Sequence, residues 1–253
     1  MASSVFKVIW DEFAGEIDAI KQLVKTFELP GGNAKVRIAA ANSATLLVAA
    51  TFEEFVREMA RAHARMVVTT TSSFDKLPKK LISTVWKRSM AGLARLRLDG
   101  EQFAREDLTI EARFSAAYSF VKGDRTQDIY RDLIHNENNM RPSELNSMFK
   151  VAGLSDMCAN VCQEQALREF FGETEASKAH GKLLVALENF FERRNKIAHA
   201  LNPGQSSAPS QIVTDLDMLL AFSSAMLKTL DNLNLQPATT SISEPATGPV
   251  STT

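Results

Sequence analysis

The sequence predicts an all-α protein. Apolar residues recur at three- and four-residue steps over long stretches, which is the helical period, and no stretch alternates convincingly as a strand would. The 253 residues include only 11 glycines and 8 prolines, so turn signals are few. A hydrophobic content of 45% supports a substantial core, and the length fits one large domain or two small ones.

Three long helices are expected in the first part of the chain. Residues 5–28 form the first, and the Leu-Pro-Gly-Gly sequence at 29–32 ends it. The second covers residues 35–68, where many alanines allow close approach of other helices. The third covers residues 79–98, and its apolar stripe includes Trp86.

Shorter elements follow. Residues 99–140 are less regular and contain two short helices, in which Tyr118 and Tyr130 are interpreted as core or half-buried aromatics. Two further short helical stretches lie at 142–153 and 155–171, and each is closed by a glycine.

Two more long helices complete the predicted bundle. The helix at 174–200 begins with acidic residues and ends with basic ones, as the helix dipole favours, and a last helix covers 209–235. The tail 236–253 has almost no large apolar residue, so we expect it to be disordered. We therefore expect a single helical domain over residues 1–235, with its core in 35–200.

Composition excludes several classes of protein. A net charge of −1 argues against a protein that coats long nucleic acids, so any contact with nucleic acid should be local. Cys158 and Cys162 have helical spacing but no partner pair that would complete a zinc site, which predicts unpaired thiols in a reducing compartment. No signal peptide precedes the first helix, and the most apolar window, residues 38–52, is too short and too polar to span a membrane. We expect a soluble, cytoplasmic protein without metal or cofactor.

One stretch, ENFFERRNKIAHALNPG, gathers unusual chemistry at the end of a helix. Asn195 and His199 are four residues apart and share a helix face, with Arg194 at the edge of that face and Arg193 and Lys196 beside them. Arginine can bind a phosphate through two parallel hydrogen bonds and offset the charge of a transition state. Histidine can move protons near neutral pH.

RNA is the substrate that this combination suits, since RNA carries its own nucleophile, the ribose hydroxyl beside the scissile phosphate. The alternative is structural. Lysine and arginine collect in last helical turns anyway, and a terminal histidine can cap free carbonyl groups.

A second set of basic residues lies on the second helix. Arg57, Arg61 and Arg65 are spaced by four and form one stripe, which we interpret as a solvated helix face, with an RNA groove as the alternative. His63 points away from that stripe and is interpreted as structural. On the motif helix, Glu192 is expected to pair with Lys196.

The residues of the motif, R-N-K-I-A-H from Arg194 to His199, resemble the R-x4-H signature of HEPN ribonuclease domains. Two other stretches resemble the HEPN branch associated with RiboL-PSP proteins. They are AANSATLLVAATFEEFVREM in the second helix and NENNMRPSELNSMFKVAGL before the motif helix. The resemblance covers about residues 35 to 235. Ala200 and Leu201 stand where members that are silenced by a nucleotidyltransferase often carry a tyrosine, so that mode of regulation is in doubt.

The resemblance implies a HEPN-like helical bundle that pairs into a homodimer with one composite cleft. It further implies a metal-independent endoribonuclease that cleaves single-stranded or loop RNA to cyclic-phosphate ends in a toxin or phage-defence system, with an antitoxin or regulatory protein as a partner. Arg194, Asn195 and His199 would be catalytic, and Arg193 and Lys196 would bind substrate. The alternative is a non-catalytic HEPN module that binds RNA, a nucleotide or a partner protein as a sensor or scaffold.

Overall fold

A computed structural model describes residues 4–26, 33–95, 110–135, 139–199 and 207–235. All regular structure in these ranges is helical, with ten α-helices, one short 3-10 helix and no strand, which confirms the predicted all-α class. The disorder expected for 236–253 concerns residues outside the described ranges.

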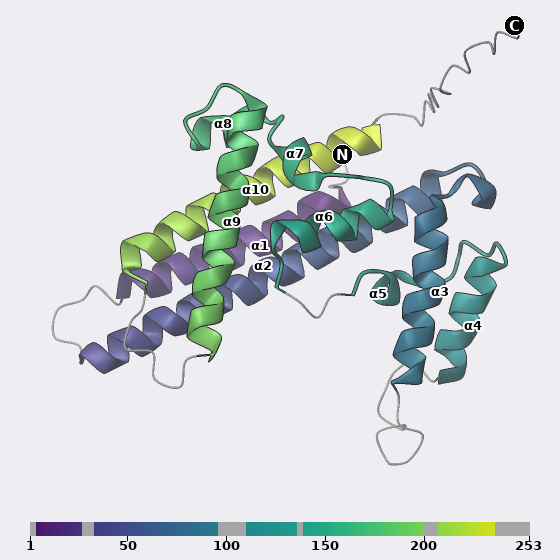
Figure 1. Ribbon diagram of the computed structural model, residues 1–253, viewed down its shortest axis with the longest axis horizontal. Helices are drawn as coiled ribbons and strands as arrows, with labels where there is room; N and C mark the ends of the chain where they lie inside the picture. The colour runs from purple at the N-terminus through teal and green to yellow at the C-terminus, as the bar shows by residue number, and fades with distance from the viewer. Residues whose placement is uncertain (1–3, 27–32, 96–109, 136–138, 200–206, 236–253) are drawn as a thin grey trace, which may run out of the picture.

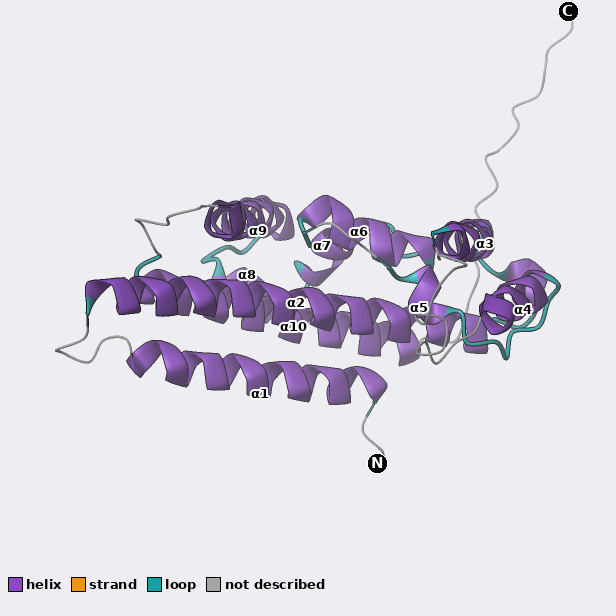
Figure 2. Cartoon of the chain, turned by 90° about the horizontal axis from the view of Figure 1, so that it is seen from below, coloured by secondary structure: helices purple, strands orange, loops and turns teal. Residues whose placement is uncertain are grey.

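Three long helices build the body of the molecule (Figure 1): α1 (Val5–Thr26), α2 (Ala34–Thr70) and α10 (Pro209–Leu235). In Figure 2, α1 forms one outer layer and α2 and α10 form the middle. Helices α6, α7 and α9 lie on the side opposite to α1. The helical period of the sequence explains α1, whose buried residues repeat along one face that packs on both α2 and α10: Phe6, Phe13, Ile17, Ile20 and Val24.

A cluster of aromatic rings locks these layers together. The Phe52 ring on α2 lies 6.3 Å from that of Phe13 on α1, 6.2 Å from that of Phe191 and 5.7 Å from that of Phe222 on α10. Phe191 belongs to α9 (Ala176–His199), the helix that carries the basic motif. One buried side chain of α2 therefore fixes the motif helix relative to the rest of the bundle.

Short helices fill the layer beside α9: α6 (Pro142–Val151), α7 (Met157–Val161) and α8 (Gln165–Phe170). Gly153 and Gly172 have φ angles of 97° and 66°, the left-handed conformation that ends a helix with little strain, as their positions predicted. The single helix expected over residues 155–171 is wrong, because α7 and α8 are separate.

Side chains of α6 and of the preceding loop fix the start of α7. The Asp156 carboxylate caps α7 by accepting from the backbone N–H of Ala159, and Asn146 of α6 donates to Asp156 and accepts from the N–H of Cys158. This fixes a short, tightly held turn of helix. Cys158 and Cys162 are both buried free thiols, and burial raises the pKa of Cys162 to about 11.

Helices α3 (Lys79–Ala94) and α4 (Ile110–Val121) project from one end of the body as an antiparallel pair, which we call the α3–α4 arm (Figure 1). A 3-10 turn, η1 (Phe74–Lys76), leads into it from α2. Two arginines attach the arm to α5 (Tyr130–Leu133). Arg88 Nη1 donates to the carbonyl of Leu133 at 2.5 Å, and Arg113 pairs with Asp132 at 2.7 Å.

Two aromatic predictions fail on the arm. Trp86 and Tyr118, expected to be buried or half-buried, are 38% and 46% exposed, whereas Tyr130 is only 5% exposed and confirms its prediction. The arm consists of two helices that pack mainly on each other, so the apolar stripe that runs over both has no further layer to cover it.

Candidate functional site at the end of helix α9

Helix α9 places the motif at the edge of the bundle. Its buried residues, Leu183, Leu187, Phe190 and Phe191, anchor the helix through its middle, and the chain then runs outward. Arg194 and Asn195 follow at half-buried positions, while Lys196 and His199 are exposed. His199 is the last residue of the helix. The motif thus leaves the core gradually, with its arginine and amide held and its imidazole in contact with solvent.

The amide oxygen of Asn195 is the acceptor that holds this end together. Arg194 Nη1 donates to it at 3.2 Å, and Asn139 Nδ2 donates to it at 2.7 Å. Asn139 belongs to the segment just before α6, 56 residues earlier in the chain. Two donors from different elements therefore fix both the Asn195 side chain and one edge of the Arg194 guanidinium.

An acid from α2 completes the surroundings of Arg194. Glu53 is half-buried, and burial raises the pKa of its carboxyl, against the opposing effects of Arg194, of Arg57 and of a hydrogen bond from the backbone N–H of Met140. Its Oε1 atom is buried without a hydrogen-bond partner among the described residues. Arg194 thus lies between an amide acceptor on its own helix and a poorly solvated carboxyl on α2.

The two residues predicted to bind substrate are both ion-paired. Arg193 Nη2 lies 2.6 Å from Asp215 Oδ1 on α10, and Gln211 donates to the same oxygen at 3.0 Å. Burial raises the pKa of the Asp215 carboxyl, while Arg193 lowers it. Lys196 pairs with Glu192 at 2.8 Å, which confirms the expected pair, although both side chains are mostly exposed. Substrate binding by Arg193 and Lys196 stays a prediction.

Two hollows of the described surface can be compared with the motif. One, of about 900 Å³, is lined by α8, α9 and α10 and includes Arg193 and Asp215. The other, of about 590 Å³, lies between α1, α2 and α5 and includes Arg65 and Tyr130. Neither of these two is lined by Arg194, Asn195 or His199.

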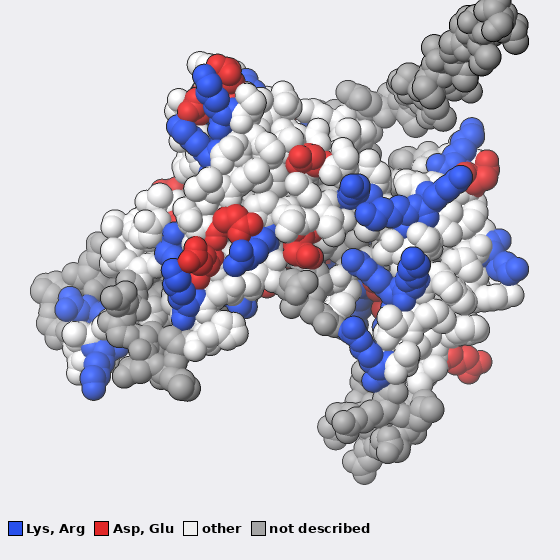
Figure 3. All heavy atoms as spheres, in the orientation of Figure 1, with Lys and Arg blue, Asp and Glu red and all other residues white. Residues whose placement is uncertain are grey.

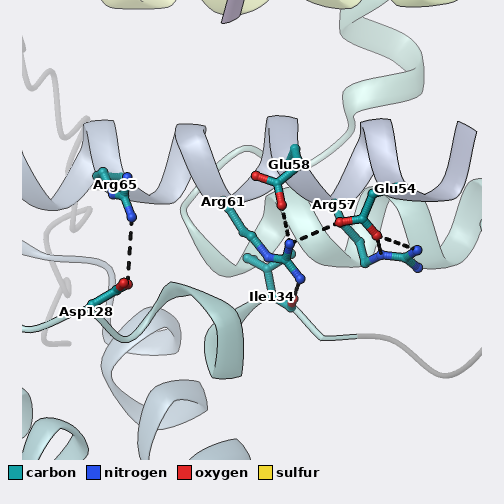
Figure 4. Close-up of polar contacts among 7 residues, drawn as sticks. All are labelled: Glu54, Arg57, Glu58, Arg61, Arg65, Asp128 and Ile134. Carbon is teal, nitrogen blue, oxygen red and sulfur yellow. Dashed lines mark hydrogen bonds and ion pairs between the residues drawn. The ribbon is translucent and has the colours of Figure 1, made fainter. Parts of the chain in front are cut away.

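The basic stripe of α2 is neutralised by acids (Figure 4). Arg57 pairs with Glu54 at 2.8 Å, and Arg61 contacts Glu54 at 3.2 Å, Glu58, and the carbonyl oxygen of Ile134 at 3.5 Å. These contacts account for the charges of Arg57 and Arg61 within the fold.

Arg65, the third member of the stripe, is more loosely held. Its guanidinium is 3.7 Å from Asp128 and 4.8 Å from the centre of the Tyr130 ring. On the opposite side of the same helix, His63 is buried at 4% exposure against Phe149, as its structural interpretation predicted.

Three residues of the site escaped the sequence analysis: Glu53, Asn139 and Arg141. Arg141 forms an ion pair with Glu188 of α9 at 2.7 Å, so the segment before α6 touches the motif helix at two points. For Glu53 the sequence holds a usable signal, because a charged residue there interrupts an otherwise buried face formed by Ala49, Val56 and Ala60. For Asn139 and Arg141 there is no such signal in the sequence.

The match to a family model covers almost the whole of this architecture. Residues 11–233 match the model described as RiboL-PSP-HEPN. The chain belongs to the RiboL-PSP-HEPN family. HEPN domains commonly bind RNA or dimerise, and many are ribonucleases. A search of curated proteins and a search of solved structures each found no match to this chain.

Two further findings concern features that the described residues do not contain. In the described part of the chain, no three His, Cys, Asp or Glu side chains come together in a way that could hold a metal ion. Likewise, none of the helices within the described ranges combines the length and the apolar character needed to cross a membrane.

Proposed function

We propose that this HEPN protein is a metal-independent endoribonuclease that cleaves single-stranded or loop RNA. The observation that carries the proposal is the pairing of a held arginine with a solvent-exposed histidine at one helix end. Arg194 is fixed by Asn195 and lies beside Glu53, and His199 stands free on the next turn. A positioned guanidinium can stabilise charge on a phosphate, and an accessible imidazole can transfer protons.

The reaction needs no nucleophile from the protein. The ribose 2′-oxygen attacks the adjacent phosphorus while the bond from phosphorus to the 5′-oxygen breaks, which leaves a cyclic phosphate and a free 5′-hydroxyl. One proton leaves the 2′-hydroxyl and one joins the departing 5′-oxygen. In this scheme His199 handles one of these protons, Arg194 binds the non-bridging phosphate oxygens, and Asn195 orients the arginine.

The open position of the motif supports action as a homodimer. His199 and Lys196 are exposed in the single chain, and in this scheme a second copy encloses the phosphate between two motif ends. Pairing two motif ends would also bring a second His199, so that one imidazole could accept a proton while the other donates one. Such a cleft would gather Arg193 and Lys196 from both copies, which gives a chain of net charge −1 a local basic surface.

The context we propose is a toxin or phage-defence system in the cytoplasm, with an antitoxin or regulatory protein as partner. A second function rests on a different observation. Arg193 and Lys196 are both paired with acids, which lowers the free positive charge at the motif. A non-catalytic module that binds RNA, a nucleotide or a partner protein as a sensor or scaffold would need no more than this.

The deciding experiment is RNA cleavage in EDTA on a panel of tRNA and unpaired RNA. Wild type is compared with Arg194→Ala, His199→Ala and, as a matched control, Arg37→Ala, which removes an exposed arginine near the start of α2. We expect cyclic-phosphate ends from wild type and the control, and a loss of roughly a hundredfold or more in both motif variants. No cleavage by folded, dimeric wild type would favour the binding module, and equal cleavage by all four proteins would exclude these residues from the site.

A further inference from the structure

The α3–α4 arm carries a row of exposed aromatic rings that the motif does not account for. Trp86, Phe114 and Tyr118 are 38%, 44% and 46% exposed. The ring centres of Trp86 and Phe114 lie 6.4 Å apart, and those of Phe114 and Tyr118 lie 6.0 Å apart with planes only 12° from parallel. We call these three residues the aromatic row.

The row is built by helix geometry and continues into a positive charge. Phe114, Tyr118 and Lys122 follow each other at four-residue steps from the outer face of α4, and Trp86 joins them from α3. Lys122 Nζ lies 5.7 Å from the centre of the Tyr118 ring. The row therefore crosses both helices of the arm and ends in an ammonium group.

The helix beside the row is strongly basic. Helix α3 contains Lys79, Lys80, Lys87 and Arg88 and no acidic residue. Figure 3 shows blue side chains gathered along this part of the surface, with few red ones among them. Arg88 is used to hold α5, but the three lysines form no ion pair with the residues that the structure describes. Within the described residues these cations differ from Arg57 and Arg61 of α2, which are paired with acids.

Exposed rings, two of them nearly parallel, together with lysines that have no acidic partner among the described residues, favour one kind of partner. Nucleobases stack on aromatic side chains, and the neighbouring phosphates pair with lysine, whereas a double helix keeps its bases stacked inside and offers only its backbone. An apolar protein segment would bury the rings but leave the lysine charges unused. Charge and ring exposure together favour a polyanion with free bases.

We propose that the aromatic row and the lysines of α3 form an accessory binding surface for single-stranded RNA. The inference rests on the proposed function, because it supplies the second contact by which the substrate is held. It explains why an endoribonuclease of net charge −1 would prefer unpaired RNA. The arm, and not the motif, carries the selectivity for unpaired bases.

Figure 1 places this surface away from the end of α9, with α5 and the start of α6 between them. An RNA bound at both places would therefore pass over α5 and the segment that contains Asn139. Since Asn139 also holds Asn195, the strand would cross the contact that orients the motif.

The test uses fluorescence from Trp86. The chain has two tryptophans, and in a Trp10→Phe background Trp86 is the only one. Trp10 lies on α1, and its indole donates to Ser223 of α10 at 3.1 Å, so its removal leaves the arm intact. His199→Ala is added to prevent cleavage, and a 12-nucleotide unpaired RNA is titrated into the full-length protein. We expect the RNA to quench Trp86.

Matched variants separate stacking from general binding. Phe114→Ala and Tyr118→Ala should each weaken RNA binding on the order of tenfold. Val36→Ala, which removes a similarly exposed apolar side chain from α2, should leave binding unchanged. Circular dichroism checks that each variant is folded. We expect all three to fold, because the substituted side chains are exposed.

Three results would overturn the inference. Unchanged affinity in both ring variants would show that the row does not bind RNA. Equal affinity for a duplex of the same length would exclude stacking. A change of oligomeric mass on removing Phe114 or Tyr118 would show that the row is a contact between copies.

The inference and the proposed function can fail separately. If the RNA quenches Trp86 but wild type never cleaves RNA, the binding surface stands and the nuclease does not. If wild type cleaves RNA and the ring variants cleave and bind as well as wild type, the nuclease stands and the arm has no part in it.

Discussion

Two groups of basic residues look alike in the sequence and differ in the structure: the stripe Arg57, Arg61 and Arg65 on α2, and the motif end of α9. On α2, Glu54 and Glu58 lie one turn before Arg57 and Arg61. Each acid forms an ion pair with the arginine that follows it in the same helix. On α9 the acid beside Arg194 is Glu53, which comes from another helix.

The origin of the acid decides what the arginine can do. On α2 each local pair joins residues one turn apart, its acid is about half exposed, and the pair contributes little beyond that helix. Glu53, an acid from another helix, is half-buried near Arg194, and its own charge is poorly solvated, since Glu53 Oε1 has no hydrogen-bond partner in the described residues. An arginine near an acid whose pKa is shifted by burial is more typical of a functional site than of an ordinary surface ion pair. Four measurements would break or sharpen this contrast.

The largest expected effect is a loss of RNA cleavage in the Arg194→Lys variant. Lysine keeps the charge but cannot make two parallel hydrogen bonds to a phosphate, so cleavage should fall by roughly a hundredfold or more, with RNA affinity nearly unchanged. Arg65→Lys on α2 is the matched control and should cleave like wild type. Single-turnover cleavage rates measured beside binding constants test this. If Arg194→Lys cleaves RNA at the wild-type rate, Arg194 contributes only a positive charge and not two parallel hydrogen bonds.

The two helices also differ in their histidines, and His63 should make stability depend on pH. Burial lowers the pKa of His63 to about 4, below its usual 6.5, so the folded protein keeps this imidazole neutral. Its contribution is complete above pH 6.5 and is lost as the pH falls toward 4, because the unfolded chain then binds the proton. Between pH 7 and pH 5 the loss should be about 2 kcal/mol.

Urea unfolding of wild type and His63→Leu at these two pH values isolates the effect. The variant should lack this part of the pH dependence, while contributions of other groups remain in both proteins. An identical loss in wild type and variant would mean that His63 becomes charged inside the fold.

Glu53→Gln should raise stability while it lowers activity. Burial raises the pKa of the Glu53 carboxyl, so replacing it by a neutral amide should stabilise the fold at neutral pH. Losing the charge beside Arg194 should also loosen the guanidinium and slow cleavage about tenfold. Thermal melts and cleavage rates of the same sample test both signs. Full activity in the variant would remove Glu53 from the site.

The smallest effect is expected on the stripe itself. Arg61→Ala removes contacts to Glu54, Glu58 and the carbonyl of Ile134, and should destabilise the protein by about 1 kcal/mol, because the partner acids are half exposed. Cleavage by the folded variant should equal that of wild type. A loss of cleavage without a loss of stability would move the stripe into the RNA path and reverse the comparison.

The sequence predicted the long helices well because their burial is periodic. Residues 209–235 were expected to be helical and are α10, and the motif helix expected at 174–200 is α9, from 176 to 199. Such helices carry many apolar residues on one face, so the pattern is strong. Over residues 155–171 the pattern misled, because α7 ends at Val161 and Arg168 of α8 donates to the carbonyls of Cys162 and Gln163 between the two helices.

The surroundings of the motif could not be predicted in the same way. The sequence located Arg194, Asn195 and His199, since they are close in the chain, but Glu53 and Asn139 reach the motif only through the packing of α2 and α6 against α9. Periodicity says that a face is buried and not what it is buried against. For the same reason Trp86 and Tyr118 were expected to be buried or half-buried, although α5 and α6 cover only part of α3 and both side chains are exposed.

The ion pair between Arg193 and Asp215 joins the end of α9 to a helix that comes later in the chain. During translation the residues of the motif are made before Asp215, and before the Phe222 ring that packs on Phe52. Early segments of a nascent chain can fold only against what has already emerged. In the ribonuclease proposed above, α9 would lack its contact with α10 until α10 has emerged from the ribosome. The nascent chain would therefore be inactive, and it would not cleave the ribosomal RNA or the messenger RNA from which it is translated.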